Sequence, residues 1–130
     1  MLDIGPLARR VAMVAAALAL VASGATPAHA SDGSVFTGNR SGGAWFDDGL
    51  ATETIYIHDY EPDGYGVRVK VWQYGSYYGT YDYTGGAGTG DDYYASFYEG
   101  EQVELQACSR DSVSGGVRVF NCGSKGVFYA

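Results

Sequence analysis

The chain alternates apolar and polar residues with a period of two over most of its length beyond residue 50. One run places Ile55 and Ile57 between more polar neighbours, and another does the same with Val67, Val69 and Val71. Successive side chains of a β-strand point to opposite faces, so this pattern predicts half-buried antiparallel strands. The runs are residues 52–60, 65–72, 101–108 and 116–122, followed by a short closing strand at 125–130. We expect a single all-β domain over residues 44–130, either an antiparallel β-sandwich or a small open barrel with one disulfide.

The segment Glu-Pro-Asp-Gly at residues 61–64 joins two of these runs. Its proline presets φ for a turn and its glycine accepts a positive φ, so we expect a hairpin connection. The carboxylates of Asp59, Glu61 and Asp63 also match the opening of a calcium-binding loop. That loop needs a bidentate Glu at its twelfth position, where this chain has Lys70, so a turn is favoured over a calcium site.

The first 30 residues have the layout of a secretory signal peptide. An arginine pair precedes an apolar run at residues 11–22, and a small-x-small cleavage site ends at Ala30. The run is shorter than the ~20 apolar residues that a membrane span needs, so cleavage is favoured over anchoring. We expect residues 1–30 to be removed, residues 31–43 to form a flexible or edge-docked N-terminal segment, and the mature protein to be secreted.

The expected mature chain is strongly acidic. Removing the leader takes Arg9, Arg10 and Asp3 from the 8 basic and 15 acidic residues, which leaves six basic and 14 acidic side chains. Such a chain repels a phosphate backbone and an anionic lipid surface, so we expect neither nucleic-acid binding nor membrane association after cleavage. We expect the mature protein to be monomeric or weakly associating.

Cys108 and Cys122 are the two cysteines of the chain. A Ser-Gly-Gly hairpin signal at residues 114–116 lies midway between them, which would place the sulfurs on neighbouring strands. In an exported protein an even pair predicts one disulfide, and closing its loop stabilises a small domain by about 3 kcal/mol. No His lies near either cysteine and there is no Cys-x-x-Cys spacing, so zinc and redox chemistry are disfavoured.

Tyrosine and glycine dominate residues 74–100. All 12 tyrosines follow the expected cleavage site, and eight of them lie in this segment. The Gly-rich stretch 84–90 predicts a loop, and its flanks predict strands with aromatic residues on both faces. Such rings combine a flat apolar face with a polar edge, which suits a binding surface, whereas packing within the sheet is the competing interpretation. The candidate contact residues are Trp72, Tyr74, Tyr77, Tyr78, Tyr81 and Tyr83.

Catalytic chemistry has few candidates in the expected mature chain. His58 is its one histidine, and the adjoining Asp59 must point to the opposite face of a strand. No Gly-x-Ser-x-Gly motif or free cysteine marks a nucleophile. The acidic pairs Asp47–Asp48 and Asp91–Asp92 allow glycoside hydrolysis or calcium binding as alternatives, although paired loop carboxylates are ordinarily solvated. We expect a protein that is not an enzyme and that has no metal or cofactor.

Four segments carry a resemblance to other proteins, namely IHDYEPDGYGVRVKV, TGGAGTG, FYEGEQVELQAC and NCGSKGVFYA. Through them, residues 45–130 resemble a group of small secreted actinobacterial proteins that have no assigned activity. The resemblance covers most of the expected mature chain. It implies the fold and the extracellular location, and it implies no particular function.

Shorter parts of the chain resemble two better-known families. Trp72-Gln73-Tyr74 is similar to the Trp-Arg-Tyr tripeptide of tendamistat-type alpha-amylase inhibitors, which are small secreted β-sandwiches, although Gln73 replaces the arginine. The spacing Tyr-x4-Tyr-x-Gly within residues 78–85 and 93–100 resembles βγ-crystallin-like proteins, which include secreted protease inhibitors. The calcium signature of that family has Ser or Thr where this chain has Ala95.

These observations predict a secreted, non-enzymatic binding protein. Its Tyr/Trp surface would contact an extracellular glycan or a secreted protein by stacking and by hydroxyl hydrogen bonds. The alternative is an inhibitor of a secreted hydrolase, an amylase or a protease. An inhibitor would act through a rigid exposed loop, for which residues 73–80 and 84–92 are the candidates.

Overall fold

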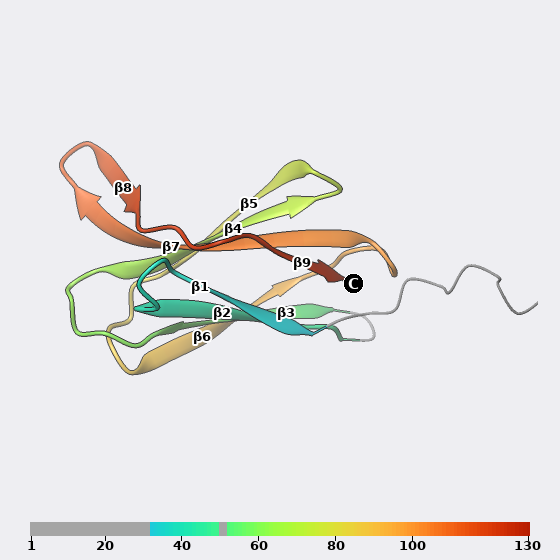
Figure 1. Ribbon diagram of the computed structural model, residues 1–130, viewed down its shortest axis with the longest axis horizontal. Helices are drawn as coiled ribbons and strands as arrows, with labels where there is room; N and C mark the ends of the chain where they lie inside the picture. Colours follow the sequence, from blue (N-terminus) through green and yellow to red (C-terminus); the bar gives the residue numbers. More distant parts are fainter. Residues whose placement is uncertain (1–31, 50–51) are drawn as a thin grey trace, which may run out of the picture.

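The computed structural model describes residues 32–49 and 52–130, and the strands found there form two antiparallel sheets (Figure 1). Sheet A has the order β1-β2-β3-β6, and sheet B has the order β5-β4-β7-β8, with β9 also paired to β7. The strands of sheet A are β1 (Gly33–Phe36), β2 (Gly42–Asp47), β3 (Glu53–Asp59) and β6 (Thr89–Ala95). Those of sheet B are β4 (Gly66–Gln73), β5 (Ser76–Tyr83), β7 (Gln102–Val113), β8 (Gly116–Phe120) and β9 (Gly126–Tyr129). The described residues contain no helix, so the all-β sandwich expected from the alternation is confirmed.

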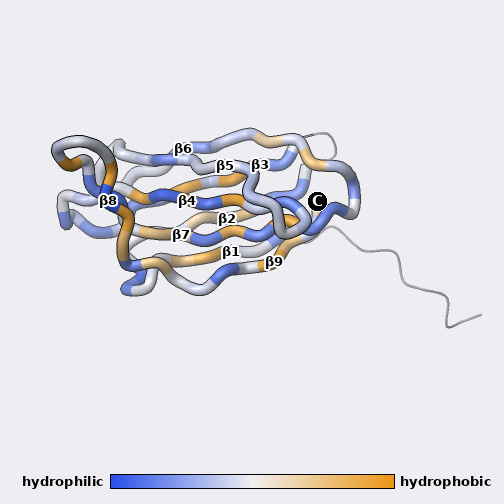
Figure 2. The backbone as a smooth tube through the Cα atoms, turned by 90° about the horizontal axis from the view of Figure 1, so that it is seen from above, coloured by the Kyte–Doolittle hydropathy of each residue, from blue (hydrophilic) through white to orange (hydrophobic). Residues whose placement is uncertain are grey.

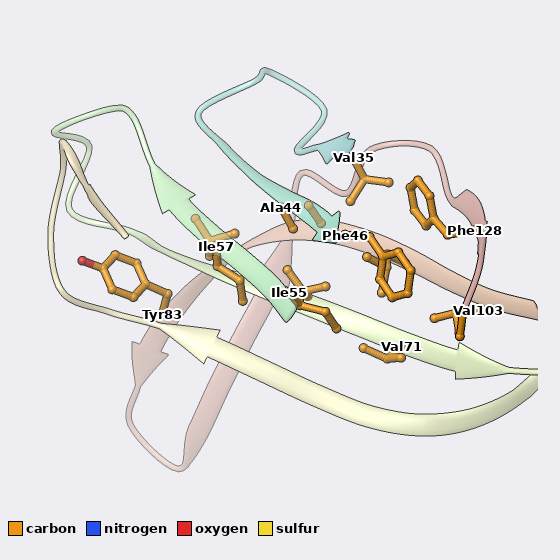
Figure 3. Close-up of a cluster of buried hydrophobic side chains, with 14 residues drawn as sticks. Val35, Ala44, Phe46, Ile55, Ile57, Val71, Tyr83, Val103 and Phe128 are labelled. Carbon is orange, nitrogen blue, oxygen red and sulfur yellow. The ribbon is translucent and has the colours of Figure 1, made fainter. Parts of the chain in front are cut away.

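The core lies between the two sheets and is built from the apolar positions of the alternating runs. Along β4 and β3 buried and half-buried residues alternate, and the hydropathy of β4 alternates with them (Figure 2). Figure 3 shows how the inward side chains of both sheets meet, with the rings of Phe46 and Phe128 stacked at 5.4 Å. Fully buried Ile55, Ile57 and Leu105 belong to the same cluster. Each such side chain contributes about 1.5–3 kcal/mol by leaving water.

The N-terminal strands extend the domain beyond the expected boundary. Residues 31–43 were predicted to be flexible or docked at an edge, and the structure places β1 and the start of β2 there. The sandwich therefore includes strands that precede the expected boundary at residue 44, and β1 is an edge strand of sheet A. The glycines at the start of β2 weaken the sequence signal for a strand, and pairing with β3 compensates for them. The expected signal peptide, residues 1–30, lies outside the described residues.

The connection between β3 and β4 is not the predicted hairpin, because β3 belongs to sheet A and β4 to sheet B. The turn chemistry itself is present. The backbone N–H of Asp63 donates to the carbonyl of Glu61 at 2.8 Å, the N–H of Tyr65 donates to Asp63 Oδ1 at 2.9 Å, and Gly64 has a φ of 79°. Turn residues specify a local bend, but they carry no information about which sheet receives the next strand.

The disulfide between Cys108 and Cys122 is confirmed. The conformation of one residue, Asn121, determines that Cys122 and not Asn121 lies opposite Cys108. In the β7–β8 hairpin Ser109 is paired with Phe120, so an unbroken ladder would place Asn121 opposite Cys108. Asn121 instead adopts a φ of 53° and donates from its side chain to Ser109 Oγ at 3.1 Å. This left-handed residue advances the chain by one position and brings Cys122 to its partner.

Candidate functional site

The β4–β5 hairpin carries the residues that the sequence singled out, and it projects from the body of the sandwich (Figure 1). Gln73 is paired with Ser76, so the turn has two residues, Tyr74 and Gly75. Both have positive φ, 47° and 76°, as hairpin turns of the primed types require. Glycine adopts this conformation freely, but it strains a bulky residue such as Tyr74. The N–H of Tyr74 donates to the carbonyl of Gln102 at 3.1 Å, which fixes the turn against β7.

A β-bulge decides which tyrosines of β5 face outward. Val71 is opposite Gly79, but the next residue, Trp72, is opposite Tyr77, so Tyr78 has no partner in the ladder. The extra residue places Tyr77 beside Trp72 on the outer face of sheet B, with their ring centroids 6.0 Å apart. The ring of Tyr78 lies 5.1 Å from that of Phe97.

Two of the six candidate residues belong to the interior. Tyr83 is buried in the core, and Tyr81 packs against it with its ring 5.1 Å from that of Tyr93. Burial raises the pKa of the Tyr81 hydroxyl, and the neighbouring Tyr78 hydroxyl adds to the shift. The packing interpretation is therefore correct for Tyr81 and Tyr83, because their positions opposite Val69 and Val67 face sheet A.

Trp72 is half-buried and one of its faces is covered. Lys125 Nζ lies 3.8 Å from the centroid of the Trp72 ring, and Glu104 Oε2 lies 3.9 Å from the same ammonium group. This cation–π contact leaves Trp72 unable to stack on a ligand unless Lys125 moves. Trp72 therefore packs between Lys125 and Tyr77 and is not part of the exposed contact surface of the hairpin.

The exposed aromatic residues at this end form a group that we call the hairpin-tip cluster. Its members are Tyr74, Tyr77, Tyr78 and Tyr98, with exposed fractions of 68%, 60%, 45% and 82%. Glu101 is buried and holds the group together, because Oε2 accepts from Gln73 Nε2 at 2.7 Å and from the N–H of Tyr98 at 2.9 Å. Sequence reasoning missed Tyr98, which follows β6 in a turn and has no strand periodicity to place it.

Sheet A carries a second aromatic surface, which we call the sheet A face. It consists of Phe36, Trp45, Tyr56, His58 and Tyr60. The alternation within β3 contains the signal, since Tyr56 lies between the buried Ile55 and Ile57 and His58 lies between Ile57 and the buried Asp59.

His58 and its neighbours form a hydrogen-bonded part of that face. The Tyr56 hydroxyl and His58 Nδ1 are 3.1 Å apart, and the Tyr60 ring lies 4.5 Å from the imidazole. Asp59 is buried on the opposite side of β3, as the strand geometry predicted. The histidine and the carboxylate next to it in sequence therefore do not form a catalytic pair with each other.

The acidic loop after β3 lines a hollow of about 260 Å3 together with Tyr65 and Arg110. Asp59 Oδ1 accepts from the N–H of Glu61 at 3.2 Å, and burial raises the pKa of Asp59. The carboxylates of Asp59 and Asp63 thus accept hydrogen bonds from the backbone of the turn, and no set of three His, Cys, Asp or Glu in residues 32–49 and 52–130 is arranged to hold a metal ion.

An ion pair links β4 to β5 on sheet B. Arg68 donates to both carboxylate oxygens of Asp82, at 2.7 and 2.8 Å, and Arg110 Nε lies 3.4 Å from Asp82 Oδ2. The hydrogen bonds from Arg68 lower the pKa of Asp82. The pair ties β4 to β5 across the ladder and fixes the base of the hairpin.

Comparison with known proteins adds no relatives to this description. No family model, curated protein or solved structure matches the chain. Across the described part of the chain, no helix is long and apolar enough to cross a membrane.

Proposed function

We propose that this chain is a secreted, non-enzymatic binding protein whose hairpin-tip cluster inserts into a concave site on another secreted protein. The observation that carries the proposal is the gathering of four exposed tyrosines, three on the projecting β4–β5 hairpin and Tyr98 on the segment after β6, which Glu101 links to the hairpin. Tyrosine provides large contact area and a hydroxyl at low entropic cost, and it is enriched in the residues that dominate binding energy. The disulfide Cys108–Cys122 supports an extracellular location.

A protein target fits this cluster better than a glycan does. The projecting tip of a two-residue hairpin is narrow and does not offer a flat platform. The neighbouring Trp72, which is not part of the cluster, has one face covered by Lys125 and is therefore not available there for stacking. A narrow aromatic tip is suited to a pocket in a partner, where each ring is desolvated on several sides.

Inhibition of a secreted hydrolase, an amylase or a protease, is the second candidate. It is favoured by the conformation of Tyr74, which the turn and the bond to Gln102 hold in one exposed arrangement before any target binds. Preorganisation of this kind reduces the entropy lost on association. Enzymes with an open substrate cleft would be the natural partners for such a tip.

The test is capture of proteins from culture supernatant on the immobilised, oxidised protein. A partner that interacts through the cluster is retained by wild type and lost from the double variant Tyr74→Ala/Tyr77→Ala. Tyr94→Ala is the matched control, because Tyr94 is 67% exposed but lies on sheet A. Equal retention by all three proteins would exclude the hairpin as the contact surface. Amylase and protease assays with the retained partner then separate inhibition from simple binding.

A further inference from the structure

We propose that the sheet A face is a separate binding surface for a neutral polysaccharide. This site lies on the opposite sheet from the hairpin-tip cluster and does not depend on the function proposed for that cluster. The inference rests on the arrangement of aromatic and polar side chains across four paired strands, on a hollow beside Trp45, and on the charge of the surrounding groups.

The strand register determines which side chains share this outer face. Ser34 is paired with Trp45, Trp45 with Tyr56, and Tyr56 with Asp92, so these four residues form one row across the whole sheet. Side chains two residues away lie on the same face, which sets the rows on either side. Those rows are Asp47, Thr54 and Tyr94 on one side and Phe36, Gly43, His58 and Gly90 on the other.

The aromatic rings form a continuous patch at the centre of this grid. The Trp45 ring lies 5.6 Å from that of Phe36, 5.9 Å from that of Tyr56 and 6.1 Å from that of Tyr60. Four strands spaced about 4.8 Å apart make the patch roughly 14 Å wide, which is the scale of an oligosaccharide and not of a single ring.

Two glycines let the rings lie close to the backbone. A Cβ atom at Gly43 would come within 2.8 Å of the Phe36 ring, and one at Gly90 within 2.5 Å of the Tyr56 hydroxyl. The rings therefore occupy the space that side chains at these positions would fill. The Trp45 ring meets those of Phe36, Tyr56 and Tyr60 at interplanar angles of 87°, 47° and 72°, so the patch is faceted and a sugar would stack on single rings within it.

The polar groups around the patch suit hydroxyl-rich ligands. A hollow of about 470 Å3 lies beside Trp45 and is also lined by Asp32, Ser34 and Asp47. The apolar C–H face of a pyranose can stack on the indole while its hydroxyls donate to these carboxylates. The combination of one ring face with several acceptors at its edge is a recognition chemistry for sugars, and it serves a purely apolar partner poorly.

Charge selects a neutral glycan over an anionic one. The carboxylates of Asp32, Asp47 and Asp92 border the face and repel uronate, phosphate or sulfate groups. Arg40 is the basic residue at this surface, and its guanidinium lies 4.2 Å from the Phe36 ring centroid, where it is engaged in a cation–π contact.

The experiment uses the exported, oxidised protein in native gels that contain a soluble polysaccharide. The neutral probes are mixed-linkage β-glucan, amylopectin, xyloglucan and galactomannan, and polygalacturonate is the anionic probe. We expect at least one neutral polysaccharide to retard the protein and polygalacturonate to leave its mobility unchanged. Trp45→Ala should weaken retardation at least tenfold, whereas Trp72→Ala on the hairpin should not alter it.

Tryptophan fluorescence locates the contact independently, because the chain has 2 tryptophans, Trp45 and Trp72. In Trp72→Phe only Trp45 reports, and in Trp45→Phe only Trp72 reports. An oligosaccharide of the retained polymer should change the emission of the first protein and leave that of the second unchanged. If Trp45→Ala does not fold, Asp47→Ala/Thr54→Ala tests the polar rim, since both residues lie outside the core cluster.

Three results would overturn the proposal. They are the absence of retardation by every neutral polysaccharide, preferential retardation by polygalacturonate, and a fluorescence response confined to Trp72. The last result would move glycan binding to the hairpin. Loss of protein capture in Tyr74→Ala/Tyr77→Ala would still test the hairpin function separately, because that variant leaves sheet A unchanged.

Discussion

The hydroxyl of Tyr93 donates a hydrogen bond of 2.5 Å to the backbone carbonyl of Asp82, and this bond joins the two sheets at their open side. Tyr93 is in β6, an edge strand of sheet A, and Asp82 is in β5, an edge strand of sheet B. The carbonyl group of an edge strand is otherwise available to another chain. The tyrosine therefore closes part of that edge while it links the layers of the sandwich.

Removing this hydroxyl should destabilise the protein. We expect Tyr93→Phe to lower the free energy of unfolding by about 1 kcal/mol, because a half-buried carbonyl loses its donor while the ring remains. Urea unfolding measures the change. Tyr94→Phe is the control, since the adjacent tyrosine is exposed on the other face of β6. Equal midpoints for both variants would contradict a structural role for the bond.

The ion pair of Arg68 and Asp82 should make stability depend on pH below about 4. The folded-state pKa of Asp82 lies below its ordinary value of 3.8, chiefly because of the hydrogen bonds from Arg68. A lowered pKa means that the pair stabilises the fold above the ordinary value and that this contribution is lost as the pH falls through the folded-state pKa.

Asp82→Asn tests this dependence directly. At pH 7 we expect it to lose about 1 kcal/mol of stability, the scale of a partly exposed charged pair. The difference from wild type should narrow as the pH falls from 3.8 through the lower folded-state pKa, because Asp82 is protonated first in the unfolded chain and then in the folded protein. Unfolding midpoints at a series of pH values give the comparison. A constant difference from pH 7 to pH 2 would show that charge is not the source of the stabilisation.

Tyr74 should limit the stability of the hairpin. Its left-handed backbone costs a non-glycine residue about 1 kcal/mol, and Asn tolerates that conformation far better. We expect Tyr74→Asn to raise the unfolding midpoint while it weakens capture of the hairpin partner. Tyr77→Asn, in the adjoining strand, should bring no such gain. A lower midpoint for Tyr74→Asn would mean that contacts of the ring outweigh the backbone strain.

Loss of the disulfide should cost more than any of these single changes. Cys108→Ser/Cys122→Ser removes a link between residues separated by 14 positions, and we expect a loss of about 3 kcal/mol. Urea unfolding of the variant should match that of reduced wild type. Midpoints equal to those of the oxidised protein would indicate that the β7–β8 ladder alone holds this part of the chain.

Much of the fold was predictable because it rests on local alternation. The strands β3, β4, β7 and β8 follow from apolar residues at every second position, and the Ser-Gly-Gly signal correctly marked the β7–β8 turn. β1 and β2 were missed, since their stability comes from pairing and from Phe36 packing over Gly43, which are contacts distant in sequence. The sheet that receives β4 is likewise decided by packing of the whole core and not by the turn before it.

The candidate site was only partly predictable, for a geometrical reason. The bulge at Tyr78 changes which residues of β5 face outward, so Tyr77 is exposed while Tyr81 and Tyr83 are directed inward. A bulge inserts one residue without any marked change in composition, and the alternation alone does not locate it. Lys125, which covers Trp72, comes from a segment more than 50 positions away in the sequence.

The glycines beneath the aromatic rings of sheet A also affect how this surface can vary. Exchange of Phe36 or Tyr56 for another ring keeps the space between ring and backbone, so such changes should be tolerated. Adding one methyl group at Gly90 would bring a carbon within 2.4 Å of the Ile57 carbonyl, and neither group can move without disturbing the β3–β6 ladder. The shape of the surface is thus constrained most tightly at a position that contributes no side chain to it.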